Sequence, residues 1–142
     1  MKLLITLLLL TISTPVYAQD KREADWASYL TVGLNVAFDS VHSYRAPNRK
    51  DAFTKQGIRL GATIASSELI KLVVHKWRPD HSDRKSFWSE HSAISGASQG
   101  WNYYIGGSLT FGTMAGRVEA DRHYPLDVAV GAGVGTLFGL IR

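Results

Sequence analysis

The apolar positions of the chain recur with the period of a helix. Between residues 57 and 77 they stand three or four positions apart, which places them on one side of a helix. They are Ile58, Ala62, Ala65, Leu69, Leu72 and Val73. We predict a helix over 57–77, and Pro79 prevents it from continuing beyond Arg78.

A second apolar stretch predicts a helix over residues 26–41. Its polar Asn35 and Asp39 are expected on a face that is at least partly wet. The charged residues 20–25 before it are expected to form a loose start. Residues 42–56 contain a proline and four cations, and this composition predicts a connecting loop.

The second half of the chain predicts the remaining helices. Residues 92–116 carry no charge, and Asn102 together with a glycine pair indicates a break into two short helices. After a turn at 121–125, residues 126–141 form the last helix. The predicted fold is therefore all-α, a compact single-domain bundle of about five helices.

Glycines recur four positions apart in three places. The sets are Gly57 and Gly61, Gly112 and Gly116, and Gly131, Gly135 and Gly139. Small residues at this spacing let a neighbouring helix backbone approach closely, so we expect these sets to pack against other helices.

The N-terminus has the features of an export signal. Lys2 precedes an apolar run over 3–10, and small residues at 16–18 suit a cleavage site. We predict a signal peptide at 1–18, one domain at 19–142 and a periplasmic or secreted location.

The composition narrows the chemistry. The chain has 16 Lys plus Arg against 12 Asp plus Glu, a net charge of +4, which suits an anionic substrate without requiring one. It has no cysteine, which excludes a disulfide scaffold and a thiolate metal site. No nucleic-acid partner is expected.

Three short segments carry cations, histidines and a carboxylate. Lys71 and Arg78 are seven residues apart, about two helical turns, so both are expected on one side of the helix near its end. Two such cations can bind one anion, or they can simply complement the helix dipole.

The second segment contains Ser89 and His91 where a helix can begin. A hydroxyl and free backbone N–H groups at that place form a natural cradle for an anion. The alternative is that Ser89 only caps the helix and His91 is a surface residue.

In the third segment, His123 and Asp127 stand four apart at the start of the last helix. This spacing lets the carboxylate reach the imidazole and fix its tautomer, which leaves the other ring nitrogen free for attack. Asp127 alone is also explained by the helix dipole.

Together the segments resemble the type-2 phosphatidic acid phosphatase (PAP2) superfamily, which includes bacterial acid phosphatases, lipid phosphate phosphatases and vanadium haloperoxidases. Its signature is Lys, six residues, Arg-Pro; then Pro-Ser-Gly-His; then Ser-Arg, five residues, His, three residues, Asp. The matching residues are Lys71, Arg78, Pro79, Ser89, His91, Arg117, His123 and Asp127. Three positions depart from the signature, because Trp88, Glu90 and Gly116 replace Pro, Gly and Ser.

The resemblance implies a phosphatase that needs no metal or cofactor. His123 would be the nucleophile, oriented by Asp127, and His91 would protonate the leaving oxygen and later activate water. The phosphate oxygens would be held by Lys71, Arg78, Ser89, Arg117 and the backbone of Glu90. A carboxylate at Glu90 repels phosphate unless it points away, and the loss of a hydroxyl at Gly116 removes a hydrogen bond of about 1 kcal/mol.

Three other interpretations of the sequence remain open. One is a vanadate-dependent haloperoxidase, and another is a protein that binds phosphate without turnover. The third is a metal site built from His75, His81, His91 and His123, although their spacing matches no familiar ligand motif.

The relation to membranes bears on the substrate. If His91 and Arg117 both lie at the site, the 25 residues between them must run away from the site and back. Each half is then about 18 Å long as a helix, too short to cross the about 30 Å hydrocarbon layer of a membrane. With Arg59 and Glu68 also inside a predicted helix, we expect a periplasmic or secreted domain. Association with a membrane through an apolar face is the alternative. The substrate is expected to be a phosphorylated small molecule or lipid, and the sequence does not set the oligomeric state.

Overall fold

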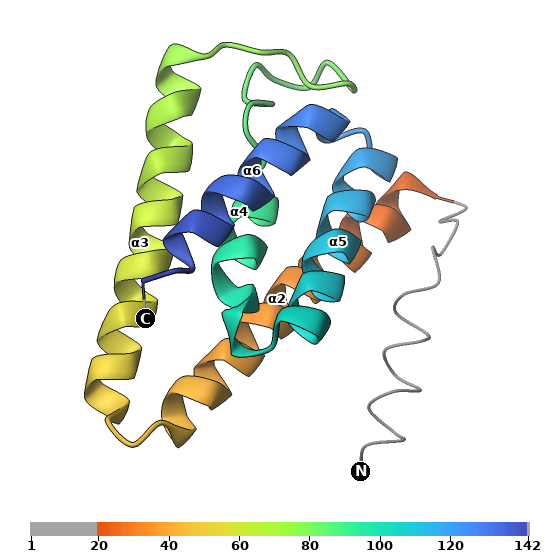
Figure 1. Cartoon of the computed structure of the whole chain (residues 1–142). Helices are drawn as coiled ribbons and strands as arrows, with labels where there is room; N and C mark the ends of the chain where they lie inside the picture. The colour runs from red at the N-terminus through yellow and green to blue at the C-terminus, as the bar shows by residue number, and fades with distance from the viewer. Residues whose placement is uncertain (1–19, 142) are drawn as a thin grey trace.

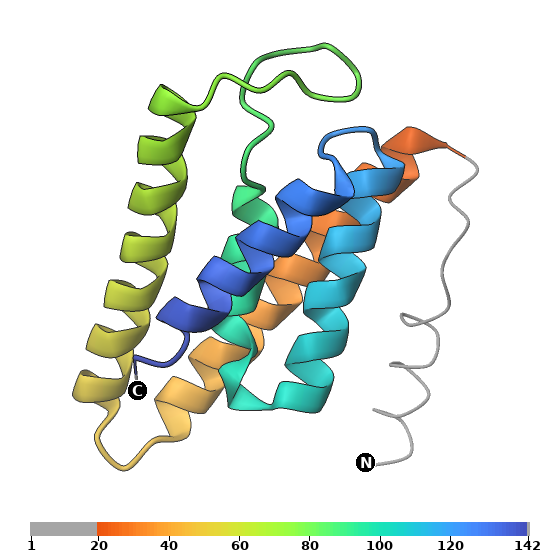
Figure 2. The ribbon, with the colours of Figure 1, turned by 45° about the horizontal axis from the view of Figure 1, so that its top comes forward.

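The computed structural model describes residues 20–141 as a bundle of helices (Figures 1 and 2). The elements are α2 (Lys21–Arg45), α3 (Arg49–Val73), α4 (Glu90–Ser98), the 3₁₀ turn η1 (Gln99–Trp101), α5 (Tyr103–Glu119) and α6 (Pro125–Phe138). The predicted all-α fold of five helices is confirmed. The predicted signal peptide lies outside the described residues.

The connection between the first two helices is much shorter than the predicted loop at 42–56. Only three residues, 46–48, separate α2 from α3. Ala46 leaves the helix with φ −64° and ψ 147°, and the Asn48 side chain caps α3 by accepting a hydrogen bond from the Asp51 N–H group at 3.2 Å. The prediction was wrong because the cations beside Pro47 are good helix formers, so only the proline marks the turn.

Helix α3 ends earlier than predicted, at Val73 rather than Trp77. Val74 is extended, with φ −100° and ψ 100°, and Lys76 forms an isolated parallel bridge with Lys85. Arg78 therefore lies in the connection between α3 and α4. The prediction that Lys71 and Arg78 lie on one side of the same helix was wrong.

The interior of the bundle is polar. Asn35 and Asp39, expected on a partly wet face, are 0% and 3% exposed. The Asn35 amide donates to the carbonyl oxygens of Ser95 and Gly106, each at 3.0 Å, and accepts from the Trp101 indole N–H at 2.8 Å. One side chain of α2 thus joins α4, α5 and η1 through hydrogen bonds.

A buried ion pair joins α2 to α3. The Arg59 guanidinium lies 2.6 Å from the Asp39 carboxylate, and both side chains are almost fully buried. Thr63 and Ser67, one and two turns further along α3, are also buried. The polar side of α3 therefore faces the bundle, whereas predicted apolar positions such as Leu69 are exposed.

Helices α4 and α6 pack backbone to backbone through glycines. A methyl group on Gly131 would overlap the Ser89 carbonyl oxygen, and one on Gly135 would overlap that of Ala93. The expected packing role is confirmed for these glycines but not for Gly57 and its partner at position 61, where a methyl group would meet no atom within 4 Å. Within residues 20–141, no individual helix has the length and apolar character needed to cross a membrane.

Candidate functional site

Backbone hydrogen bonds bring the three predicted segments to one end of the bundle. The Asp80 N–H group, just after the first segment, donates to the carbonyl of Asp121 at 3.2 Å. Likewise Ser89 in the second segment donates to the carbonyl of Asp127 in the third at 3.1 Å. Figure 1 shows this end at the top, where α3 ends and α4 and α6 begin. The three short segments therefore lie close together at this end of the bundle.

His123 is buried in the connection before α6 and makes one hydrogen bond that sets its tautomer. Its Nδ1 atom lies 2.7 Å from the Ser86 carbonyl oxygen. A carbonyl oxygen can only accept, so the proton is on Nδ1 and the Nε2 atom keeps a lone pair. Burial lowers the pKa of His123 to about 3, and the charges of Arg117 and Arg78 act in the same direction. The ring is therefore neutral at physiological pH.

Asp127 does not make the predicted bond to the imidazole of His123. Its carboxylate accepts from the Ser86 hydroxyl at 2.5 Å, Lys76 Nζ at 2.6 Å and the Tyr124 N–H group at 3.3 Å. The i, i+4 rule fails because α6 begins only at residue 125, so His123 is not on the helix. Ser86 contacts both residues, His123 through its carbonyl oxygen and Asp127 through its hydroxyl.

His91 lies in the first turn of α4, with its ring edge-on to Tyr29 at a centroid distance of 4.8 Å. Burial lowers the pKa of His91 to about 4, and Arg117, Lys71 and Arg78 add to this effect while Asp25 opposes it. Both arginines thus act on both imidazoles. Arg78 and Arg117 lower the pKa of both histidines, and Lys71 lowers that of His91.

Each predicted phosphate-binding cation is paired with a carboxylate. Lys71 donates to Glu68 at 2.7 Å and to Glu90 at 2.8 Å. The carboxylate that replaces glycine in the signature therefore points toward the first cation of the site rather than away from it. A phosphate ester at Lys71 has to compete with Glu90.

The two arginines are held in a similar way. Arg78 donates from Nε to Asp83 at 2.7 Å, and Arg117 donates from Nη1 to Asp25 at 2.5 Å. The Nε atom of Arg117 is buried without a hydrogen-bond partner among the described residues. Burial lowers the pKa of the Arg117 guanidinium. A buried cation with an unused donor is a place where an anion is favourable.

The start of α4 shows the capping role that the sequence left open for Ser89. Ser89 is the N-cap residue, and its hydroxyl accepts from the Ser92 N–H group at 3.4 Å and from the Ser92 hydroxyl at 3.1 Å. The Ser89 side chain is thus occupied within the helix. The backbone N–H groups of Glu90 and His91 lack partners in the preceding turn and carry the positive end of the dipole.

Packing explains two departures from the signature. A side chain at Gly116 would come within 2.7 Å of the Ala24 carbonyl oxygen and 3.0 Å of Ser28, so α2 occupies the space of the missing serine. Trp88 donates from its indole nitrogen to the Ser67 hydroxyl at 2.8 Å and joins the site loop to α3.

Sequence reasoning missed three residues of this region. Asp25 binds Arg117 from the segment predicted to be a loose start, while Lys76 and Ser86 bind Asp127 from the long loop. No spacing rule links these residues to the signature. The one sequence feature that could have indicated a role for Asp25 is its charge directly before an apolar stretch.

The described residues offer no metal-binding cluster, and the comparisons with known proteins identify no family. In residues 20–141, no three His, Asp or Glu side chains are grouped closely enough to hold a metal ion, which includes the four histidines considered above. A cavity of about 360 Å³ lies at the opposite end of the bundle, lined by Asp39, Lys55 and Arg59 among others, and contains no predicted site residue. Comparisons with family models, curated proteins and solved structures gave no match.

Proposed function

We propose that this chain is a phosphomonoesterase of the PAP2 type that acts through a phosphohistidine without a metal ion. One observation carries the proposal: the imidazoles of His91 and His123 lie in the field of Arg78 and Arg117 at one end of the bundle, and the buried ring of His123 keeps a lone pair on Nε2. A nucleophilic histidine must be neutral to attack, and cations must surround the phosphoryl oxygens in the transition state. The substrate class is a phosphorylated small molecule or lipid.

In the first half-reaction, the Nε2 lone pair of His123 attacks phosphorus. A P–N bond forms while the ester P–O bond breaks, and His91 gives a proton to the departing oxygen. The Nδ1–H bond to the Ser86 carbonyl keeps the ring in the reactive tautomer. The negative charge of Asp127, which opposes the lowering of the His123 pKa by burial, supports the positive charge that the ring acquires.

In the second half-reaction, water attacks phosphorus and gives a proton to His91, which is then neutral and able to accept it. The P–N bond breaks and inorganic phosphate leaves. Lys71, Arg78 and Arg117, with the N–H groups at the start of α4, hold the non-bridging oxygens in both steps. Binding of the phosphate dianion raises the pKa of His91 and so restores the acid form that the first step needs.

Hydrolysis of para-nitrophenyl phosphate by the full chain tests this proposal. His123→Ala is expected to reduce the rate to background, whereas His42→Ala, at an exposed position on α2 far from the site, leaves it unchanged. An alkaline denaturing quench with substrate radiolabelled in the phosphoryl group should trap a protein-bound phosphoryl adduct that is stable in base and lost in acid. A chelator should not change the rate, and vanadate should inhibit. Full activity in His123→Ala refutes the assignment of the nucleophile.

A second candidate function has its own support. Because Lys71, Arg78 and Arg117 are all paired with carboxylates, the site is also suited to weak phosphate binding without turnover. Saturable binding of inorganic phosphate with no detectable hydrolysis would favour this alternative.

A further inference from the structure

The large apolar side chains of the described residues gather on the outside of the bundle. Exposed examples occur on α2, α3, α5 and α6, and we call this outer surface the apolar belt. Its members include Leu30, Ile58, Leu69, Phe111, Leu126 and Leu137, with exposed fractions from 52% to 70%. Exposure of this kind on four helices is unusual for a protein whose surroundings are water.

The inside of the bundle has the opposite character. The buried positions hold mostly serine, threonine and alanine, together with Asn35 and the Asp39–Arg59 ion pair. Helices in lipid pack in this way, with small residues and hydrogen-bonding groups at their contacts and charges turned inward. A bundle in water places its apolar stripe inside.

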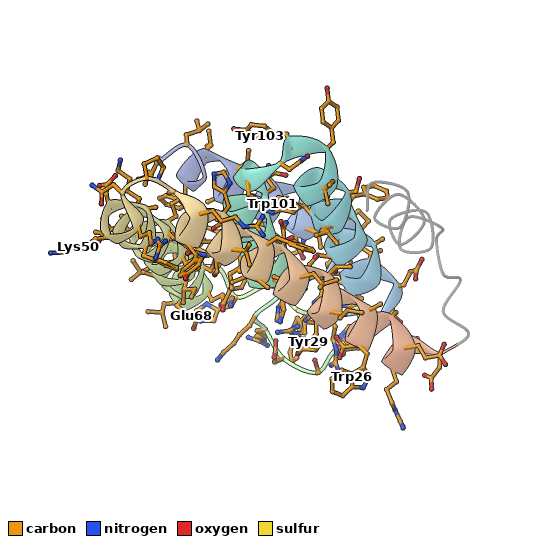
Figure 3. All side chains as sticks on the ribbon, turned by 90° about the horizontal axis from the view of Figure 1, so that it is seen from below. Trp26, Tyr29, Lys50, Glu68, Trp101 and Tyr103 are labelled. Atoms are coloured by element: carbon orange, nitrogen blue, oxygen red, sulfur yellow. The ribbon has the colours of Figure 1, made fainter. Side chains whose placement is uncertain are left out.

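The charged and aromatic residues define the two edges of the belt. Around the α2–α3 connection lie Arg45, Arg49, Lys50 and Lys55, and at the site end lie Lys76, Arg84, Lys85 and Arg122. Exposed aromatic side chains lie at the site end, where they are Trp26, Tyr29 and Tyr124, and Tyr44 lies near the other end of α2. Figure 3 shows Trp26 and Lys50 at opposite ends of the molecule. Tryptophan and tyrosine favour the level of lipid headgroups, and cations favour anionic headgroups.

The height of the belt agrees with this arrangement. From Trp26 to Tyr44, α2 rises about 27 Å at 1.5 Å per residue, close to the ~30 Å of a hydrocarbon layer. The one Asp, Glu, Lys or Arg in that interval is Asp39, which is buried. Between Lys55 and Lys71, the exposed charge of α3 is Glu68, which lies near the site end and is paired with Lys71.

The belt surrounds the molecule, and this decides what covers it. Figures 1 and 2 show α3 and α5 on opposite sides of α6, and the belt includes residues of all three helices. A second copy of the chain covers one side of a bundle, whereas acyl chains cover every side. We propose that the acyl chains of a phospholipid membrane cover the apolar belt, with the site end at headgroup level. This inference does not depend on the proposed phosphatase activity.

Flotation of the full chain with vesicles of phosphatidylethanolamine and phosphatidylglycerol is the primary test. In about 1 M NaCl, where the Debye length is about 3 Å, the chain is expected to float with the vesicles. Leu30→Gln, Phe111→Gln and Leu137→Gln together should abolish flotation. The matched triple variant Arg49→Gln, Lys50→Gln and Lys55→Gln should still float.

A pair of tryptophan reporters keeps the test decisive if the apolar triple variant does not fold. Lipids brominated deep in their acyl chains should quench the fluorescence added by Phe111→Trp, in the middle of the belt, several-fold more than that added by Lys50→Trp at its edge. Equal quenching of the two reporters overturns the proposal. So does a full chain that is monomeric in water without lipid or detergent. A stable lipid-free oligomer that shields the position 111 reporter overturns it too, and assigns the belt to a second copy.

Discussion

Neutralising Glu90 should strengthen phosphate binding, because this carboxylate forms an ion pair with Lys71, one of the proposed phosphate-binding cations. Glu90 lies 2.8 Å from Lys71 Nζ, and the Lys71 side chain is only 10% exposed. Replacement by glutamine keeps the size and the helix position and removes the charge. Lys71 then retains Glu68 as its partner on the outer side.

The size of the effect follows from the electrostatics of the site. Two unit charges about 5 Å apart interact by about 3 kcal/mol at an effective dielectric constant of about 20. Glu90 is 26% exposed, so solvent screens part of this repulsion and about 1–2 kcal/mol remains. Glu90→Gln is therefore expected to lower the Kd for inorganic phosphate about 5- to 30-fold, at 1.4 kcal/mol per tenfold.

Isothermal titration calorimetry with inorganic phosphate measures the change, and Glu68→Gln is the matched control. Glu68 binds the same lysine but is 56% exposed, so its neutralisation should change Kd less than about threefold. Circular dichroism establishes that both variants keep their helices. An unchanged Kd in a folded Glu90→Gln protein would refute the idea that this carboxylate competes with phosphate.

Three other predictions follow from the packing and the charges. Gly116→Ser, which restores the signature, should lower the melting temperature without increasing activity, because the new side chain meets the backbone of α2. A variant that is equally stable in thermal unfolding and faster in kinetic assays would contradict this packing explanation. Replacing Arg59 by methionine should cost about 3–5 kcal/mol in urea unfolding, because it removes the guanidinium that faces the buried Asp39 carboxylate. The additional change Asp39→Leu should recover most of this loss, and additive losses would argue against a coupled pair. Because catalysis needs neutral His123 (pKa about 3) and protonated His91 (pKa about 4), kcat/KM should be highest between about pH 3 and 4 and fall above it; a maximum near pH 7 would contradict these roles.

The sequence predicted helices well but not which side of each helix faces inward. The spacing of Leu69 and its neighbours indicates that they share a side of α3, and periodicity carries no information on whether that side is covered by protein. Asn35 was expected at a wet face because amides are usually exposed. The acceptors within hydrogen-bond distance of its amide nitrogen belong to residues 60 to 75 positions away.

The site was predictable to the extent that its spacing is local. The three segments that carry the cations and the histidines lie together at one end of the bundle. Partners supplied by other elements were not predictable, because Ser86 reaches His123 and Asp25 reaches Arg117 across 37 and 92 residues of sequence. The expected His123–Asp127 bond failed because one proline at position 125 sets the helix start two residues too late.

The contact between α4 and α6 links the fold to the precision of the site. Gly131 touches the Ser89 backbone. A methyl group added at Gly131 would therefore displace the first turn of α4, where the proposed phosphate-binding N–H groups lie. A displacement of about 1 Å can slow an enzyme about a hundredfold. Mutational scanning should therefore find that Gly131, which has no side chain of its own, tolerates substitution as poorly as the histidines do.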